Sequence, residues 1–462
     1  MLGPSSQTEQ SPGVVSHHAS TTIGGVRRLA INSASLTITS YVAQIANLFL
    51  YLLAARVLGP AVFGPIAGLI GIAILVGSFA DFGINGITTR ALAQDSTSIE
   101  PFRRTLGAKL AISLILAALW LTIALASPEP PPLHWSTVFM SGYLLLLILG
   151  GTMTVPFRAM ERMGVVGIVA AVEKSVALGA WLLLQHFAAG HPEVLSLAMT
   201  VGGAAALVVA TTMLPRGHLR LSVPSARQVA ALWSSSFSFG VVGAASQLMR
   251  ADVAIVGSVA GPYVAGLYAA PSRLASFVTV LPSSFSSAVF PRLASGRGGR
   301  TVRLQAAFGG AIVMAIMATG LITLAVFAPY VVPLALGRAY VGSVVVFRVY
   351  MLVIFLNSAN QPLLSFLQAE GHEVYAARAV GLSAVIGLVS IAVGARLDGG
   401  AGAACGAVLM QALQMAGMAY KAYRETRSSR RDTAEAEYIR NLGDRTSGTR
   451  LPKDESKSLG DT

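Results

Sequence analysis

The chain has 462 residues, of which 54% are apolar and only 11% are charged, and its mean hydropathy is +0.66. A water-soluble protein carries roughly 25% charged residues, so this chain has too few to cover a soluble body of its size. Most of its outer surface must therefore face lipid, and the composition predicts an integral membrane protein. The single cysteine, Cys405, excludes an internal disulfide and any metal cluster built from cysteines.

Apolar segments long enough to cross a membrane, about 20 residues each, follow one another along the chain. Residues 1–26 are polar and are expected to form a disordered arm. Arg27 and Arg28 precede an apolar stretch that is long enough to span the membrane and continues without a convincing cleavage site, so we expect a first membrane helix there and not a removed signal. The twelve expected spans are approximately 30–54, 64–86, 107–126, 136–156, 164–187, 193–214, 233–258, 263–290, 306–330, 342–365, 374–395 and 400–420.

These spans divide into two groups of six, so the sequence predicts an all-α polytopic membrane protein with two six-helix lobes. The N-terminal lobe is expected over residues 27–214 and the C-terminal lobe over 233–420, with a cytoplasmic linker at 215–232. From 421 to 462 the chain is rich in Arg, Ser, Asp and Glu and is expected to be a disordered cytoplasmic tail.

The placement of the basic residues predicts the orientation, because positively charged loops stay in the cytoplasm. Most of the 33 lysines and arginines fall on the side of the two termini, Lys109 among them. Only Arg56, Arg338 and Arg396 fall on the opposite side. We therefore expect a multi-pass protein of the plasma (inner) membrane with both termini in the cytoplasm. The same distribution explains the net charge of +13 without a nucleic-acid partner.

The two halves also repeat each other in sequence. Gly59-Pro60-Ala61-Val62-Phe63-Gly64 recurs as Gly261-Pro262-Tyr263-Val264-Ala265-Gly266, each copy after the first helix of its half. One residue out of register with this repeat, positions on one face of the preceding helices correspond as well. Two lobes related by a pseudo-two-fold axis around a central cavity are typical of transporters. The corresponding positions are Ser33, Thr37, Ser40, Gln44 and Asn47 in the first half and Ser236, Gly240, Gly243, Gln247 and Arg250 in the second.

Short motifs in a fixed order carry a family resemblance over approximately residues 26–420. The chain resembles the polysaccharide flippases that export O-antigen and exopolysaccharide units (Wzx-type), within the multidrug/oligosaccharidyl-lipid/polysaccharide exporter superfamily. The motifs are Leu58-Gly59-Pro60-x-x-Phe63-Gly64, Asp81-Phe82-Gly83, Asp252-Val253-Ala254-Ile255-Val256-Gly257, Val264-x-Gly266-x-Tyr268-x-Ala270, Phe290-Pro291-x-Leu293, Leu336-Gly337-x-x-Tyr340 and Gly400-Ala401-Gly402-Ala403-Ala404.

The resemblance implies a fourteen- or twelve-helix fold with a V-shaped central cavity, and this chain has room for twelve. It also implies movement of an undecaprenyl-pyrophosphate-linked oligosaccharide from the cytoplasmic to the outer leaflet, for lipopolysaccharide or exopolysaccharide synthesis. Membrane lipid and this lipid-linked oligosaccharide are the expected partners, and polysaccharide polymerase machinery is a further candidate. No bond is made or broken, so the protein is not expected to be an enzyme.

A pyrophosphate is prohibitively costly to move through hydrocarbon unpaired, so charges within the membrane are the candidate site. Arg250 has an alternative role as a partner of Asp252, which requires a helix break because residues two apart on a helix do not face each other. Arg273 has the same alternative partner, and Arg348 could be an interface anchor. The substrate-binding candidates are Arg273, Arg250, Lys174 and Arg348, with the amides of Gln44, Asn47 and Gln247.

No nucleotide-binding loop is found, so an ion gradient (H+ or Na+) or the downhill flow of product is expected to drive transport in place of ATP. Glu173 and Asp252 are the candidate coupling groups. Glu173 and Lys174 point about 100° apart on a helix and are not expected to neutralise each other simply, although a pairing between helices is an equal alternative. Asp81 is expected to be structural, as a partner of Arg90 or of a helix end.

No cofactor and no metal site are expected, because His186 and His191 have no other ligand near them in the sequence. The close-packing pairs Gly64-x-x-x-Gly68 and Gly402-x-x-x-Gly406 are expected to act within one chain.

Three other functions compete with this interpretation. A membrane glycosyltransferase or polymerase needs a large outer loop with catalytic groups, and the loops outside are short. A cation-coupled multidrug exporter usually has acidic groups in its cavity, whereas this chain has four basic mid-membrane residues against two acids. A lipid II flippase also binds a pyrophosphate but usually has fourteen helices. The multidrug exporter and the lipid II flippase stay open as alternatives.

Overall fold

A computed structural model describes residues 13–95, 98–127, 131–215, 217–219, 222, 225–276, 299–369 and 371–447. All regular structure in these residues is helical, so the expected all-α fold is confirmed. The helices are α1 (Gly13–Asp81), α2 (Ile84–Gln94), α3 (Glu100–Ala126), α4 (Pro131–Met153), α5 (Val155–Ala159), α6 (Met163–Phe187), α7 (Glu193–Met213), α8 (Ala226–Gln247), η1 (Leu248–Ala251), α9 (Asp252–Ala260), α10 (Pro262–Ser276), α12 (Gly299–Val326), α13 (Ala328–Leu336), η3 (Arg338–Ser343), α14 (Val344–Ala369) and α15 (Glu373–Ser447).

Within the described residues, eight helical segments are long and apolar enough to cross a membrane. Two of them, Ser35–Asp81 and Val374–Glu425, have 47 and 52 residues, and each is long enough for two crossings. The expected seventh span is broken into α8, η1 and α9. The expected eighth span is described only as far as Ser276, in α10. The polytopic architecture with about twelve spans, predicted from the sequence, is therefore confirmed.

Sharp turns at glycine separate successive spans at one end of the bundle. Gly59 divides α1 with φ 70° and ψ 169°, and Gly261 separates α9 from α10 with φ 93° and ψ 166°. Only glycine adopts this conformation readily. The two copies of the Gly-Pro repeat thus share one backbone geometry. We call this the elbow end of the bundle, and the opposite end, which includes Asp81 and Arg158, the terminus end.

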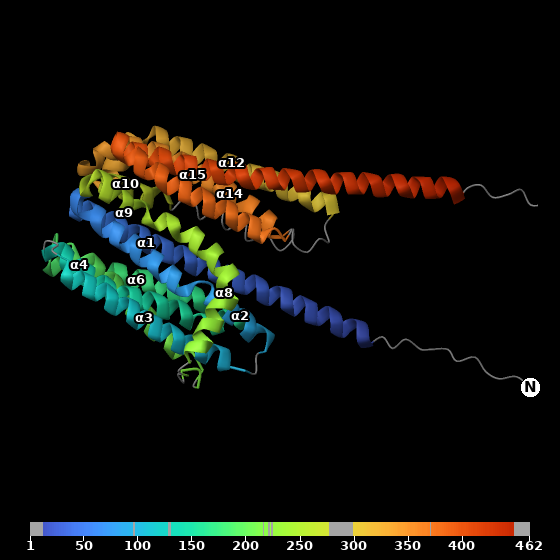
Figure 1. The fold of residues 1–462 in the computed structure, drawn as a ribbon, viewed down its shortest axis with the longest axis horizontal. Coiled ribbons are helices and arrows are strands. Elements are labelled where there is room, and N and C mark those ends of the chain that lie inside the picture. The colour runs from blue at the N-terminus through green and yellow to red at the C-terminus, as the bar shows by residue number, and fades with distance from the viewer. Residues whose placement is uncertain are drawn as a thin grey trace, which may run out of the picture.

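Two helical lobes lie side by side (Figure 1). The N-terminal lobe is formed by α1 to α7, and the C-terminal lobe by α8 to α15. Contacts between the lobes run mainly through α1, which packs against α8, η1, α9 and α10, and through α2 against α8. This seam between the lobes positions the candidate site.

The seam is closest at the elbow end, where backbone meets backbone. A Cβ atom added to Gly64 would overlap with the backbone of Pro262 and Gly266, and one added to Gly266 would overlap with Pro60. Small residues allow this approach, as is usual between membrane helices. Gly402 approaches Gly394 in the same way. These glycines therefore pack within one chain, as expected from the sequence.

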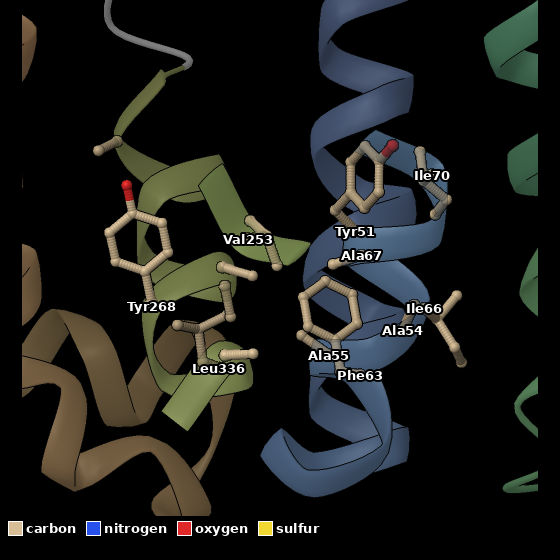
Figure 2. Close-up of a cluster of buried hydrophobic side chains, with 14 of the residues drawn as sticks. Tyr51, Ala54, Ala55, Phe63, Ile66, Ala67, Ile70, Val253, Tyr268 and Leu336 are labelled. Atoms are coloured by element: carbon tan, nitrogen blue, oxygen red, sulfur yellow. The ribbon is translucent and has the colours of Figure 1, made fainter. Parts of the chain in front are cut away.

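Buried apolar side chains fill the seam (Figure 2). Tyr51 and Phe63, from the two halves of α1, make an edge-to-face contact with ring centroids 6.5 Å apart. Figure 2 shows Val253 and Tyr268 on the facing helices of the C-terminal lobe. The core thus joins the two lobes.

The described part of the chain begins at Gly13 and ends at Ser447, at the same end of the molecule (Figure 1). There the helices extend further than the sequence predicted: α1 begins at Gly13, inside the expected arm, and α15 continues to Ser447, inside the expected tail. About half of residues 421–447 are good helix formers (Ala, Arg, Lys, Glu and Leu), which favours the second extension. The helix α8 likewise begins at Ala226, within the expected linker.

Candidate functional site

The expected seventh span is broken where the first candidate arginine lies. The 3-10 segment η1 separates α8 from α9 and contains Arg250. The Nε atom of Arg250 donates a hydrogen bond to Oε1 of Gln247 at 3.3 Å. A Cβ atom added to Gly71, on α1, would overlap with the carbonyl oxygen of Arg250. Arg250 and Gln247 therefore lie together at the seam between the lobes.

Asp252 begins α9 and is buried. Its Oδ1 atom accepts a hydrogen bond from the backbone N–H of Val253 at 2.7 Å, and its Oδ2 atom accepts one from the hydroxyl of Tyr268 at 3.0 Å. The Tyr268 ring in turn contacts that of Tyr350, with centroids 5.9 Å apart. Asp252 makes no ion pair within 4.0 Å in the described part of the chain, although Arg250 and Arg273 are its electrostatic neighbours. The break needed for Arg250 to pair with Asp252 exists, but the direct pair does not form.

Arg273 projects from α10 toward the N-terminal lobe. Its guanidinium carbon lies 5.5 Å from the centroid of the Tyr51 ring, a cation–π distance. Its Nε atom is buried and has no hydrogen-bond partner among the described residues. Buried donors are nearly always satisfied, so such an atom indicates a missing partner. Arg250 and Arg273 are also close enough to interact as like charges.

Lys174 and Glu173 contribute charge from the N-terminal lobe. Nζ of Lys174 lies 2.6 Å from Oε1 of Glu173, so the expectation that these neighbours would not neutralise each other is wrong. Both side chains have enough rotatable bonds to bend toward each other across the 100° between their Cα–Cβ directions. Tyr143 and Tyr51 are electrostatic neighbours of Lys174. Tyr51 is therefore near both Lys174 of the N-terminal lobe and Arg273 of the C-terminal lobe.

A pocket of about 190 Å³ lies inside the N-terminal lobe, among α4, α6 and α7. Tyr143 and Glu173 line it in the middle of their helices, and Thr154 and Arg158 line it toward the terminus end. The pocket thus brings the Glu173 carboxylate into a partly polar space within the lobe.

The remaining candidates lie at different distances from this cluster. Asn47 and Gln44 are one and two turns before Tyr51 on the same face of α1, and Gln44 is exposed. Arg348 is exposed on α14, and its Nε atom donates a hydrogen bond to the carbonyl oxygen of Ala325 at 3.1 Å. The structure brings together Arg250, Arg273, Asp252 and Gln247, with Lys174 reached through Tyr51, and does not bring Arg348 to them.

One buried charge was not predicted from the sequence. Lys109, which the sequence places among the cytoplasmic loop charges, is fully buried in α3. Its Nζ atom lies 2.9 Å from Oδ1 of Asp81 and donates a hydrogen bond to the carbonyl oxygen of Ala80 at 2.6 Å. The sequence does contain a sign of this burial, because Lys109 is followed directly by a largely apolar span.

No group of three potential metal ligands occurs in the part of the chain that the structure describes.

Solved structures of transporters share this fold. An inward-facing multidrug resistance transporter of the MATE family of the MOP superfamily matches with a TM-score of 0.62 and 12% identity, over 86% of this chain and 95% of its own. An outward-facing transporter of the same family matches at 0.59 and 15%, over 86% and 96%. The lipid II flippase MurJ, in an inward closed conformation, matches at 0.66 and 11%, over 84% and 87%. At these identities the likeness establishes the fold alone.

No curated protein matches the sequence. The model of the polysaccharide biosynthesis protein family, however, matches residues 29–296, which is more than half of the chain and includes all six expected N-terminal spans, α8, α9 and α10. The motifs that carried the sequence resemblance in this range include Gly59-Pro60, Asp81-Phe82-Gly83 and Asp252 with its neighbours. The chain belongs to the polysaccharide biosynthesis protein family.

Proposed function

We propose that the protein translocates an undecaprenyl-pyrophosphate-linked oligosaccharide from the cytoplasmic to the outer leaflet of the plasma membrane by alternating access. The observation that carries this proposal is the pair of neighbouring arginines at the seam, Arg250 and Arg273, with the Nε atom of Arg273 buried and without a hydrogen-bond partner among the described residues. Two like charges at a lobe interface are stabilised when an anion lies between them.

A pyrophosphate suits this pair chemically. The guanidinium group is planar, always charged and able to give two parallel hydrogen bonds to phosphate oxygens. The Tyr51 ring beneath Arg273 orients that guanidinium without consuming its hydrogen-bond donors. Gln247 and the Gln44–Asn47 face of α1 supply amides for sugar hydroxyls. Lys174 is a third cation, held by Glu173 in this structure.

The alternatives are distinguished by charge. A cationic drug would meet Arg250 and Arg273 unfavourably, so the cluster favours an anionic substrate over the multidrug exporter function. A lipid II flippase would bind the same pyrophosphate, and only the sugar separates the two substrates. Family membership in polysaccharide biosynthesis favours a polysaccharide repeat unit, for lipopolysaccharide or exopolysaccharide.

Orientation and coupling complete the proposal. Arg90, Arg104 and Arg158 lie at the terminus end, which supports cytoplasmic termini.

We propose that Glu173 and Asp252 couple transport to H+ or Na+. Glu173 lines the pocket of the N-terminal lobe, and Asp252 lies beside both arginines. Polysaccharide polymerase machinery would receive the exported unit.

The test is to delete the gene and measure lipid-linked oligosaccharide on the inner leaflet. Accumulation that the wild-type gene relieves, and that stably expressed Arg273→Ala and Arg250→Ala do not relieve, supports the function and the site. If no lipid-linked oligosaccharide accumulates, the proposed substrate is wrong and a drug-efflux assay is the next step. Full rescue by both variants would retain the function and reject the site.

A further inference from the structure

The motif Asp81-Phe82-Gly83 lies where α1 ends at the terminus end and the chain turns into α2. Phe82 has φ 38° and Gly83 has φ 78°. A positive φ is uncommon for a bulky residue such as phenylalanine and persists only where the surroundings hold it. The positive φ ends the helix at Phe82, so the Phe82 side chain points in a different direction from the one that a continued α1 would give it.

A buried ion pair fixes this turn from within the N-terminal lobe. Lys109, on α3, binds both the Asp81 carboxylate and the carbonyl oxygen of Ala80, which precedes the turn. The Lys109 side chain is fully buried, so these two oxygens stabilise its charged ammonium group in place of water. Loss of either side chain would release the end of α1, and with it Phe82.

The Phe82 ring reaches across to the C-terminal lobe. It stacks on the ring of Trp233, on α8, with centroids 5.4 Å apart and planes within 13°. It also lies directly over Gly240, where an added Cβ atom would overlap with the ring. Gly240 therefore leaves a recess that the Phe82 ring occupies.

We propose that Phe82, Trp233 and Gly240 form a latch that closes the seam at the terminus end, and that Asp81 and Lys109 position it. Its chemistry differs from that of the elbow end, where backbones interlock through Gly64 and Gly266. Two stacked rings and a recess separate without breaking a helix or exposing a charge. The latch opens when the lobes separate at the terminus end, and closes when they approach.

Spin-label distances test the latch without any substrate, so their outcome is independent of the proposed function. In the full chain carrying C405A, labels are attached to cysteines at Arg162 and Gln368, exposed positions at the terminus end of the two lobes. We expect Phe82→Ala and Trp233→Ala each to raise the population at long distance at least twofold. Lys109→Met should have the same effect, because it removes the ion pair that holds the turn at Phe82. The matched control is Phe79→Ala, which removes an exposed ring one turn earlier on α1. Distance distributions of F82A and W233A that equal the wild type would overturn the proposal.

A disulfide trap tests whether the latch must open. The ideal Cβ position at Gly240 is 2.5 Å from Cγ of Phe82, so the two Cβ atoms lie at most about 4.0 Å apart, adding roughly one C–C bond, within disulfide range. We expect F82C/G240C to oxidise readily, to lose export when oxidised and to regain it on reduction.

The control pair for the trap is A379C/G417C, within the C-terminal lobe, where the corresponding distance is 3.6 Å. Oxidation of this pair is expected to leave export unchanged. Failure of F82C/G240C to form a disulfide, or equal export in its oxidised and reduced forms, would contradict the latch. If the reduced variant and the wild type both fail to export the lipid-linked oligosaccharide, the proposed function is at fault and the spin-label result still decides the latch.

Discussion

The charges within the spans of the two lobes have different partners. In the described part of the N-terminal lobe, the lysines within spans have acidic partners: Lys109 has Asp81 at 2.9 Å and Lys174 has Glu173 at 2.6 Å. In the C-terminal lobe, Arg250 and Arg273 make no ion pair within 4.0 Å among the described residues. The buried acid beside them, Asp252, is hydrogen-bonded instead by Tyr268.

Charges that are paired within the lobe, such as Lys109 with Asp81, stabilise the fold. The arginines at the seam, unpaired among the described residues, are available to bind an anionic ligand. A buried charge is costly, and a pair within the lobe offsets that cost during folding. An arginine at the seam that makes no direct ion pair keeps hydrogen-bond donors for an anion, so the binding of that anion is favoured. We therefore expect substitution of Lys109 to act mainly on stability and substitution of Arg273 to act mainly on export.

The largest effect on export is expected for Arg273→Ala. Hydrogen bonds to a charged group contribute about 1.5–3 kcal/mol, so export of the lipid-linked oligosaccharide should fall about 10- to 100-fold. Arg273→Lys retains the charge but not the planar fork, and should recover part of the activity. Transport in proteoliposomes, with thermal unfolding as the control for folding, measures both. Unchanged export by a stable R273A protein would show that Arg273 does not bind the substrate, and would contradict the proposed difference between paired and unpaired charges.

The largest effect on stability is expected for Lys109→Met. Removing one partner of a fully buried pair costs about 3–5 kcal/mol, and the cost here should be near the lower value because the Asp81 side chain is 35% exposed. Denaturation of the purified protein in detergent measures it. The double variant D81N/K109M should be more stable than K109M alone, because no uncompensated carboxylate remains. Additive costs in the double variant would show that the two side chains do not interact.

A smaller effect is expected for Glu173→Gln. The pair with Lys174 is partly exposed, and the glutamine amide oxygen can still accept a hydrogen bond, so stability should fall by only about 1 kcal/mol. If Glu173 also carries the coupling ion, E173Q should lose the dependence of export on an imposed H+ or Na+ gradient. Export that depends on the gradient as in the wild type would assign Glu173 to structure alone.

The smallest effect is expected for Arg348→Gln. This arginine is exposed and gives its hydrogen bond to the Ala325 carbonyl, away from the seam. Stability should change by about 0.5 kcal/mol or less, and export should stay within about twofold of the wild type. A loss of export comparable to that of R273A would show that the site extends to α14 and that position at the seam is not what distinguishes the arginines.

Much of the architecture could be predicted because it depends on local sequence patterns. Apolar runs locate the spans, and the Gly59-Pro60 and Gly261-Pro262 elbows reveal the repeat, because each requires a glycine conformation that other residues avoid. The arginines at the seam could be identified for a related reason. A charge within an apolar helix is rare enough to be a candidate by itself.

The partners of these residues could not be predicted in the same way. Asp81 and Lys109 meet only because α3 packs beside the end of α1, and Phe82 meets Trp233 only across the seam. Helical spacing fixes the direction of a Cα–Cβ bond but not where a long side chain ends, which is why the Glu173–Lys174 pair was missed. The helical extension of α15 to Ser447 arose from helix propensity that the charged composition of the segment concealed.

The central claim is that the arginine pair at the seam binds a pyrophosphate. The most direct measurement compares the affinity of the purified protein in nanodiscs for undecaprenyl pyrophosphate and for uncharged undecaprenol. We predict that the wild type binds the pyrophosphate at least about tenfold more tightly and that R250A/R273A loses this preference while it still binds the lipid tail. Equal affinity of the wild type for both lipids, or a preference that survives in R250A/R273A, would contradict the account.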